Sequence, residues 1–152
     1  MTSPLDQAFA LLAAGRAGDA RAAFDAVLAQ WPDLPDAHRG RALVDARLGR
    51  ADLAIAALSR AGARFPSHAL LHADLGRLLA YGGAHADAIG PFERAVALAP
   101  GAADLWFLLG VTLERLQRFH GALDALREAE RPAPGNPRIA SALAGLELAH
   151  GD

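Results

Sequence analysis

The chain has 152 residues, of which 53 % are hydrophobic and 21 % charged, and its formal net charge is −2 at pH 7. This near balance of charge gives no reason to expect binding to nucleic acid or to an anionic membrane. The chain contains no cysteine, and all 15 basic residues are arginine, so disulfides, thiolate chemistry and lysine Schiff bases are excluded.

The first predicted helix begins at the N-terminus. Ser3 is the expected N-cap, Pro4 the first helical residue, and Asp6 the acidic residue three positions after the cap. The segment lacks a basic start, and Asp6 and Arg16 flank only a short apolar run, so we expect no secretory signal. No run approaches the ~18 apolar residues of a membrane span. We therefore expect a cytoplasmic protein.

Apolar residues at helical spacing predict about nine helices along the whole chain. Taken in order, their approximate residue ranges are 4–14, 17–30, 36–48, 51–64, 68–81, 84–98, 102–116, 119–131 and 137–150. Gly15, Gly49 and Gly83 follow the first, third and fifth of these ranges. Glycine readily takes the left-handed conformation that ends a helix. Gln117 stands in the corresponding place after the seventh.

The helices repeat with a fixed period. The prolines that follow each second helix, Pro32, Pro66, Pro100 and Pro134, lie 34 residues apart. Small residues and bulky residues recur at the same 34-residue interval. The small residues of the first helices are Ala8, Ala42, Gly76 and Gly110, and the bulky residues of the second helices are Phe24, Leu58, Phe92 and Leu126. Small residues let two helix backbones approach closely, while the bulky ones fill the space beside them.

The last full copy of the unit carries a known pattern. Trp106, Leu109 and Gly110 stand on its first helix, Ala122 is on its second, and Pro134 closes it. The chain therefore resembles the tetratricopeptide repeat, whose pattern is W-x2-L-G-x2-Y, then A-x3-F, then P. Leu113 replaces the usual Tyr, and Leu126 replaces the usual Phe.

The resemblance implies an all-α fold, a right-handed α-solenoid of antiparallel helix pairs. We expect residues 1–152 to form a single domain. Its expected repeats are about 1–34, 35–68, 69–102 and 103–136, followed by a terminal helix over 137–150.

Two interpretations of the terminal helix remain open. It is either the capping helix that a solenoid needs, or the first half of a fifth repeat in a longer protein. A further alternative is self-association through the open end of this helix, with Ile139, Leu143, Leu146 and Leu148 partly uncovered.

No catalytic constellation is visible in the sequence. His68 and His72 are four residues apart, the spacing of a shared helix face that metal ligands can use. However, His72 also stands in the repeat column of His38 and Trp106, that is, at the same place in successive repeats, which favours a packing role. We expect no catalytic residues, no metal and no cofactor.

Proteins of the tetratricopeptide repeat family bind peptides or partner helices in a concave groove lined by the first helix of each repeat. The residues that the resemblance places in this groove are Phe9, Arg39, Leu43, Arg47, Asp74, Arg77, Tyr81, Phe107, Val111 and Arg115. Guanidinium groups suit carboxylates, and aromatic residues and arginine are common at binding hot spots. These residue types indicate an acidic-apolar peptide or an amphipathic helix as the partner. The alternative is that the arginines only solubilise a helical surface.

We therefore expect a non-enzymatic protein–protein interaction scaffold in a bacterial-type assembly. The alternative is a substrate-recruiting region of a larger bacterial enzyme. The resemblance suggests a glycosyltransferase, sulfotransferase or hydroxylase, with the catalytic domain outside this chain.

Overall fold

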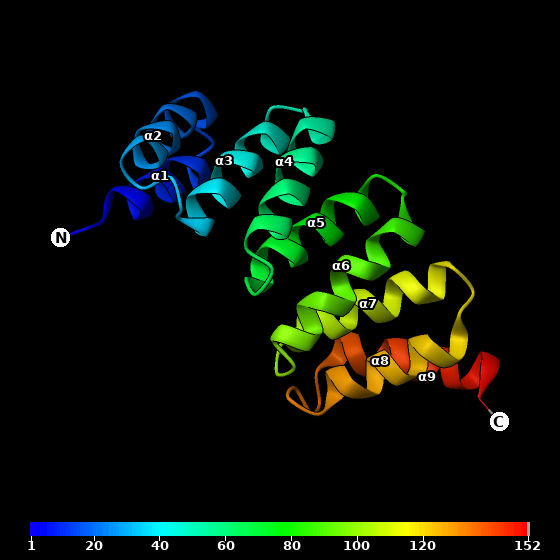
Figure 1. The fold of residues 1–152 in the computed structure, drawn as a ribbon. Helices are drawn as coiled ribbons and strands as arrows, with labels where there is room; N and C mark the ends of the chain where they lie inside the picture. Colours follow the sequence, from blue (N-terminus) through cyan, green and yellow to red (C-terminus); the bar gives the residue numbers. More distant parts are fainter. Residues whose placement is uncertain (152) are drawn as a thin grey trace. The chain divides into compact units, whose positions relative to one another are not determined.

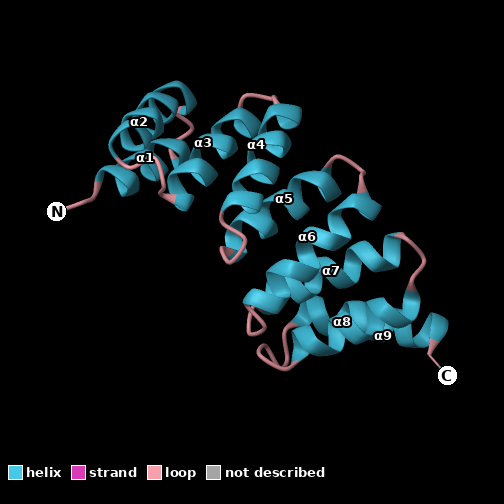
Figure 2. Ribbon diagram, viewed as in Figure 1, coloured by secondary structure: helices cyan, strands magenta, loops and turns pink. Residues whose placement is uncertain are grey.

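The structure is a computed structural model that describes residues 1–151. These residues form nine helices and no strand (Figures 1 and 2). In chain order the helices are α1 (Pro4–Ala13), α2 (Ala17–Gln30), α3 (Pro35–Arg47), α4 (Ala51–Arg64), α5 (Ala69–Tyr81), α6 (His85–Leu98), α7 (Ala103–Arg115), α8 (Phe119–Glu130) and α9 (Pro137–His150). The predicted all-α fold is confirmed, and each helix begins and ends within one residue of its predicted bounds.

The chain forms two compact units, Met1–Leu71 and His72–Asp152. In the first unit α1 packs on α2, α2 on α3 and α3 on α4, and α1 also contacts α3. In the second unit α6 packs on α7, α7 on α8 and α8 on α9. The division into 34-residue repeats and the single domain over residues 1–152 remain predictions.

The capping pattern at the start of the chain is confirmed. The Ser3 hydroxyl accepts a hydrogen bond from the Asp6 backbone N–H, and the Asp6 carboxylate accepts one from the Ser3 backbone N–H. This reciprocal pair satisfies two N–H groups that the first turn of an α-helix leaves without partners.

The tight turns between paired helices use the left-handed backbone conformation, as predicted for the glycines. Gly15 and Gly49 both have φ of 77°, and Gly83 has φ of 86°. Gln117 adopts the same conformation with φ of 59°, the only positive φ outside glycine within residues 1–151. The turn at Gln117 keeps the same closing hydrogen bond as the turn at Gly15. Arg118 N–H donates to Leu113 C=O at 2.9 Å, and Arg16 N–H donates to Leu11 C=O at 3.0 Å.

We predict that Gln117→Gly stabilises the protein by about 0.5–1 kcal/mol. A side chain in the left-handed region costs roughly 1–2 kcal/mol, which exceeds the about 0.5–1 kcal/mol of extra chain entropy that glycine loses on folding. Chemical denaturation would measure the change. The reverse substitution, Gly49→Gln, should destabilise, and the prediction is wrong if Gln117→Gly lowers the free energy of unfolding.

Bulky side chains of the second helices fill the space beside small residues of the first helices. In the second unit Phe92 and Leu126 are completely buried. A Cβ on Gly76 would lie 2.7 Å from the Phe92 ring, and one on Gly110 would lie 2.8 Å from Leu126 Cγ. In the first unit a Cβ on Gly40 would collide with the buried ring of Phe24. These glycines set how closely the helices approach.

We predict that Gly40→Ala destabilises the first unit by about 1–3 kcal/mol, because the added methyl overpacks the core. Alanine is the better helix former, so intrinsic propensity predicts the opposite sign. Gly18→Ala is the matched control, since a Cβ on Gly18 in α2 meets nothing within 4 Å. The Gly18→Ala control should raise the free energy of unfolding by about 0.5–1 kcal/mol. Thermal unfolding followed by circular dichroism would compare the two variants, and equal melting shifts would contradict the packing argument.

The terminal helix is better covered than the sequence indicated. Ile139, Leu143 and Leu146 are buried, in one cluster with Leu126 and Ala129 of α8. The expectation that these three residues stay partly uncovered was wrong, because α9 places them on the face that packs against α8. The fourth residue of that expectation, Leu148, is 90 % exposed. Among the described residues, no helix has both the length and the apolar character needed to cross a membrane.

Candidate functional site

Four of the predicted groove residues lie in the first unit. The Phe9 ring contacts Phe24 edge to face, with ring centroids 4.9 Å apart. The Arg39 guanidinium carbon lies 5.6 Å from the centroid of the Phe9 ring, a distance typical of a cation–π contact. Leu43 is half-buried against the same cluster, and Arg47 is exposed at the end of α3. The structure therefore joins Phe9 and Arg39 directly and leaves Arg47 outside this contact.

In the second unit, first helices of successive predicted repeats form a pocket of about 230 Å³. We refer to it as the α7–α9 pocket. Its lining residues are Arg77 of α5, Ala103, Asp104, Phe107 and Leu108 of α7, Asn136, and Arg138 and Ile139 of α9. The pocket thus combines an apolar lining with two guanidinium groups and one carboxylate.

Arg77 is held in place by two carboxylates. Its Nη1 lies 3.1 Å from Asp74 Oδ1, and its Nη2 lies 3.0 Å from Asp104 Oδ2. Asp74 is only 6 % exposed, so its side chain forms part of the support beneath Arg77 rather than open surface. The Arg77 charge is therefore already compensated within the pocket.

Arg138 has a different environment. Its guanidinium carbon lies 4.8 Å from the centroid of the Phe107 ring. The side chain of Asn136 accepts hydrogen bonds from the backbone N–H groups of Arg138 and Ile139, which fixes the start of α9. Within residues 1–151 no carboxylate pairs with Arg138. Among the described residues, Arg138 is therefore the cation of this pocket that has no ion pair.

Besides Asp74, three predicted groove residues of the second unit do not line the pocket. Tyr81 is 94 % exposed at the end of α5, Val111 is half-buried, and Arg115 is exposed in the last turn of α7. Conversely, Asp104 and Arg138 line the pocket but were not predicted from the sequence. These two residues lie 34 positions apart, in one repeat column, and this column was the signal that could have identified them.

The repeat column of His38 and Trp106 serves packing. His38 Nε2 lies 2.7 Å from the carbonyl oxygen of Pro32. Trp106 Nε1–H donates to the carbonyl oxygen of Pro100 at 2.9 Å. Both side chains thus tie the start of a first helix to the proline of the preceding link. In the part of the chain that the structure describes, no group of three or more His, Asp or Glu side chains is arranged to hold a metal ion.

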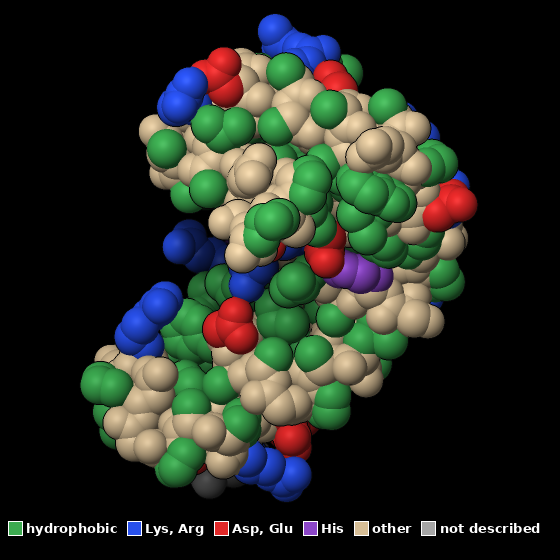
Figure 3. Space-filling view, turned by 90° about the vertical axis from the view of Figure 1, so that its left-hand side faces the viewer, with side chains coloured by type: hydrophobic (Ala, Val, Ile, Leu, Met, Phe, Trp, Pro, Cys, Tyr) green, Lys and Arg blue, Asp and Glu red, His purple; other side chains and the backbone are tan. Residues whose placement is uncertain are grey.

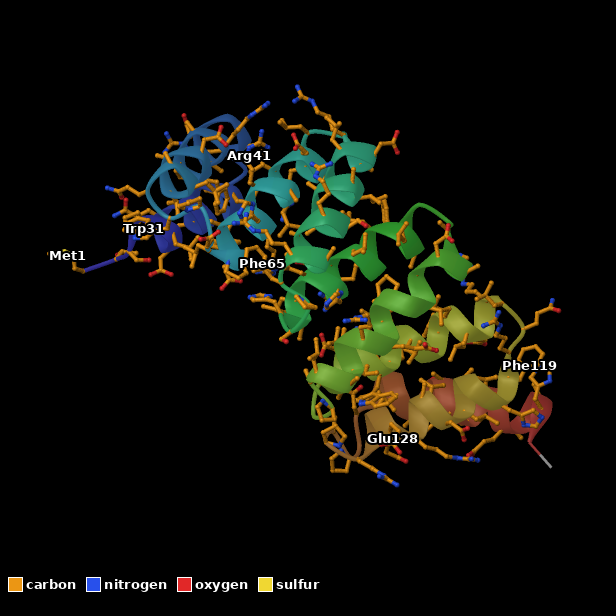
Figure 4. All side chains as sticks on the ribbon, in the orientation of Figure 1. Met1, Trp31, Arg41, Phe65, Phe119 and Glu128 are labelled. Carbon is orange, nitrogen blue, oxygen red and sulfur yellow. The ribbon has the colours of Figure 1, made fainter. Side chains whose placement is uncertain are left out.

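A polar groove of about 440 Å³ lies along α3 and α4 in the first unit. Arg41, which projects from α3 (Figure 4), bridges Asp25 of α2 at 2.8 Å and Asp45 of α3 at 3.0 Å. Asp45 is only 8 % exposed, and Arg41 is the nearer of its two cations, since Arg50 Nη1 lies 3.8 Å from Asp45 Oδ1. Arg60 and Arg64 line the same groove from α4.

We predict that Arg41→Ala costs about 2 kcal/mol of folding stability, because it leaves the Asp45 carboxylate buried without its main partner. Arg16→Ala is the control. Its ion pair with Asp19, at 2.8 Å, is more than half exposed on both sides and should contribute less than about 0.5 kcal/mol. The double variant Arg41→Leu/Asp45→Leu should recover stability, since it removes both buried charges together. Urea denaturation would measure all three, and equal losses for the two single variants would refute the argument.

Charges of both signs share the surface. The face in Figure 3 carries arginines and carboxylates intermixed with hydrophobic side chains, without a continuous basic or acidic field. Recognition on such a surface depends on local combinations of charged and apolar groups rather than on long-range attraction.

A sequence model described as Tetratricopeptide repeat matches the chain three times, over residues 5–69, 42–103 and 73–137. Together these matches cover most of the chain. A comparison with curated protein sequences found no match.

Several solved structures share the fold. A structure titled "MamA 41-end from Desulfovibrio magneticus RS-1" aligns with a TM-score of 0.81 at 18 % identity, over 98 % of this chain and 86 % of that one. A structure titled "Functional Characterization of Pseudomonas Aeruginosa pilF" aligns with a TM-score of 0.86 at 20 % identity, over 96 % of this chain and 67 % of that one. At these identities the likeness establishes the solenoid fold and does not extend to function.

Proposed function

The chain belongs to the tetratricopeptide repeat family, and we propose that it is a non-enzymatic scaffold that binds a peptide or partner helix through the first helices of its repeats. The observation that carries this proposal is the α7–α9 pocket, to which α5, α7 and α9 all contribute side chains. Its lining contains no serine, cysteine, histidine or lysine, so it holds no Ser–His or Cys–His pair of the kind used in covalent catalysis.

The side chains of the pocket indicate the chemistry of the partner. Phe107, Leu108 and Ile139 supply an apolar surface. Arg138 supplies a guanidinium that lies over the Phe107 ring and has no carboxylate partner within residues 1–151. Arginine pairs readily with carboxylates. We propose a partner segment that places a bulky apolar side chain in the pocket and an Asp or Glu side chain against Arg138.

Arg77 has a supporting role in this proposal. Since Asp74 and Asp104 already compensate the charge of its guanidinium, Arg77 attracts an incoming carboxylate less strongly than an arginine without such partners. Arg77 therefore shapes one wall of the pocket, and the attraction for an acidic residue rests on Arg138. Of these two arginines, the sequence had placed only Arg77 in the groove.

A selection from a random peptide library displayed on phage tests the proposal with the full chain. We predict enrichment of peptides that carry an acidic residue beside a bulky apolar one. Arg138→Glu should lower the affinity for the selected peptides by about tenfold or more, since loss of a hot-spot contact costs at least about 1–2 kcal/mol of binding free energy. Isothermal titration calorimetry would measure the affinities.

Arg94→Glu is the matched control, because Arg94 is an exposed arginine of α6 outside the pocket. It changes the net charge by the same amount and should leave the affinity within about twofold. Phe107→Ala provides a second variant, which removes the apolar surface without changing the charge. The proposal fails if the selected peptides bind both pocket variants as tightly as they bind the unmodified chain.

A further inference from the structure

A second groove lies on the other side of α7. It has a volume of about 550 Å³ and runs between α6, α7 and α8; we refer to it as the α6–α8 groove. Trp106, Leu109 and Leu113 of α7 form its floor. An α-helix turns by about 100° per residue, so these three side chains point away from Phe107 and Leu108. The groove and the α7–α9 pocket therefore use opposite faces of one helix and share no lining residue.

The floor of this groove is apolar, and none of its side chains needs a further hydrogen-bond partner. The indole N–H of Trp106, the one polar atom of the three floor side chains, already donates to the carbonyl oxygen of Pro100. Trp106 and Leu113 are only partly buried by the surrounding core. A partner side chain could therefore cover them and gain hydrophobic stabilisation without breaking a hydrogen bond.

The corresponding place in the first unit is polar. Leu109 and Leu113 of α7 stand in the repeat columns of Arg41 and Asp45 of α3. In the first unit Arg41 pairs with Asp45 and also with Asp25 of the preceding helix. The first unit therefore supplies its own cation here, whereas the second unit has leucine side chains at both positions.

Three carboxylates line the α6–α8 groove, and no basic residue is among its lining side chains. Glu93 comes from α6, where it stands in the repeat column of Asp25. Asp124 and Glu128 come from α8, and Glu128 is labelled in Figure 4. Glu128 lies 3.4 Å from Arg131, which is largely exposed.

The other two carboxylates differ from Glu128 in their pairing. Within residues 1–151 neither Glu93 nor Asp124 has an ion-pair partner. Glu93 has no arginine partner on α7 because Leu109 stands in the repeat column of Arg41, the arginine that pairs with Asp25 in the first unit. The groove thus combines an incompletely covered apolar floor with two carboxylates, Glu93 and Asp124, that have no ion-pair partner in the described part of the chain.

We propose that the α6–α8 groove binds a basic amphipathic helix of a partner protein. The apolar face of that helix would cover Trp106 and Leu113, and its Lys or Arg side chains would pair with Glu93 and Asp124. This is the helix-in-groove mode of recognition, and the charge complementarity selects a basic partner. The site is separate from the α7–α9 pocket, whose proposed partner is acidic and apolar.

The two tryptophans of the chain allow a direct measurement. Trp31 lies in the first unit, so the variant Trp31→Phe leaves Trp106 as the one fluorescent indole. The probe is a synthetic amphipathic helical peptide of leucine and lysine, and the matching peptide of leucine and glutamate is its control. Binding of the leucine–lysine peptide should shift the Trp106 emission to shorter wavelength and saturate at one peptide per chain.

In the Trp31→Phe chain, the double variant Glu93→Lys/Asp124→Lys should lower the affinity for the leucine–lysine peptide by about tenfold or more. The reason is that it reverses both charges that face the partner. The matched control is Glu114→Lys/Glu130→Lys. It makes the same change in net charge at two exposed residues of α7 and α8 outside the groove, and it should change the affinity by less than about twofold. All four positions are on the surface, and circular dichroism verifies that each variant is folded.

Several results would overturn the proposal. One is equal weakening by the two double variants, which would show nonspecific attraction between opposite charges. Others are tighter binding of the leucine–glutamate peptide, or no saturable emission shift with the leucine–lysine peptide. Light scattering measures the oligomeric state and so tests whether a second copy of the chain occupies the groove. That is the conclusion if the unmodified chain self-associates and the Glu93→Lys/Asp124→Lys variant does not.

Discussion

The packing of a bulky side chain against a small residue is the constraint on which each unit depends. Phe24 lies against Gly40 in the first unit, and Phe92 and Leu126 lie against the glycines at positions 76 and 110 in the second. A two-helix hairpin is too small to bury its own apolar face, so it must stack on its neighbours. Close approach at the glycines makes this stacking tight enough to exclude water.

Because this internal packing uses only part of each helix, the remaining faces are free to differ from repeat to repeat. On α7, one face carries Phe107 into the α7–α9 pocket, and the opposite face carries Leu109 into the α6–α8 groove. On α3, the repeat column of Leu109 holds Arg41, which binds two carboxylates instead. One scaffold thereby presents apolar and polar surfaces at equivalent positions.

Local charge pairing decides which arginines are available for a partner. Arg77 and Arg138 both line the α7–α9 pocket, yet Arg77 binds Asp74 and Asp104 while Arg138 stacks on Phe107. A guanidinium that already has carboxylate partners offers less to an incoming acid than one that lacks them. The number of arginines along the first helices therefore overstates how many are available to bind the carboxylates of a partner.

The sequence by itself determined the helices, their bounds, the turns and the family, because these follow from local periodicity, from glycine and proline, and from a fixed repeat of 34 residues. It also identified Phe107 and Arg77, but it did not identify Asp104 or Arg138 and expected Leu143 to be partly uncovered. Only the tertiary structure decided the pairing of Arg77, the burial of α9 and the two faces of α7. Such features depend on which side chains from different helices meet, and periodicity along one chain does not specify those meetings.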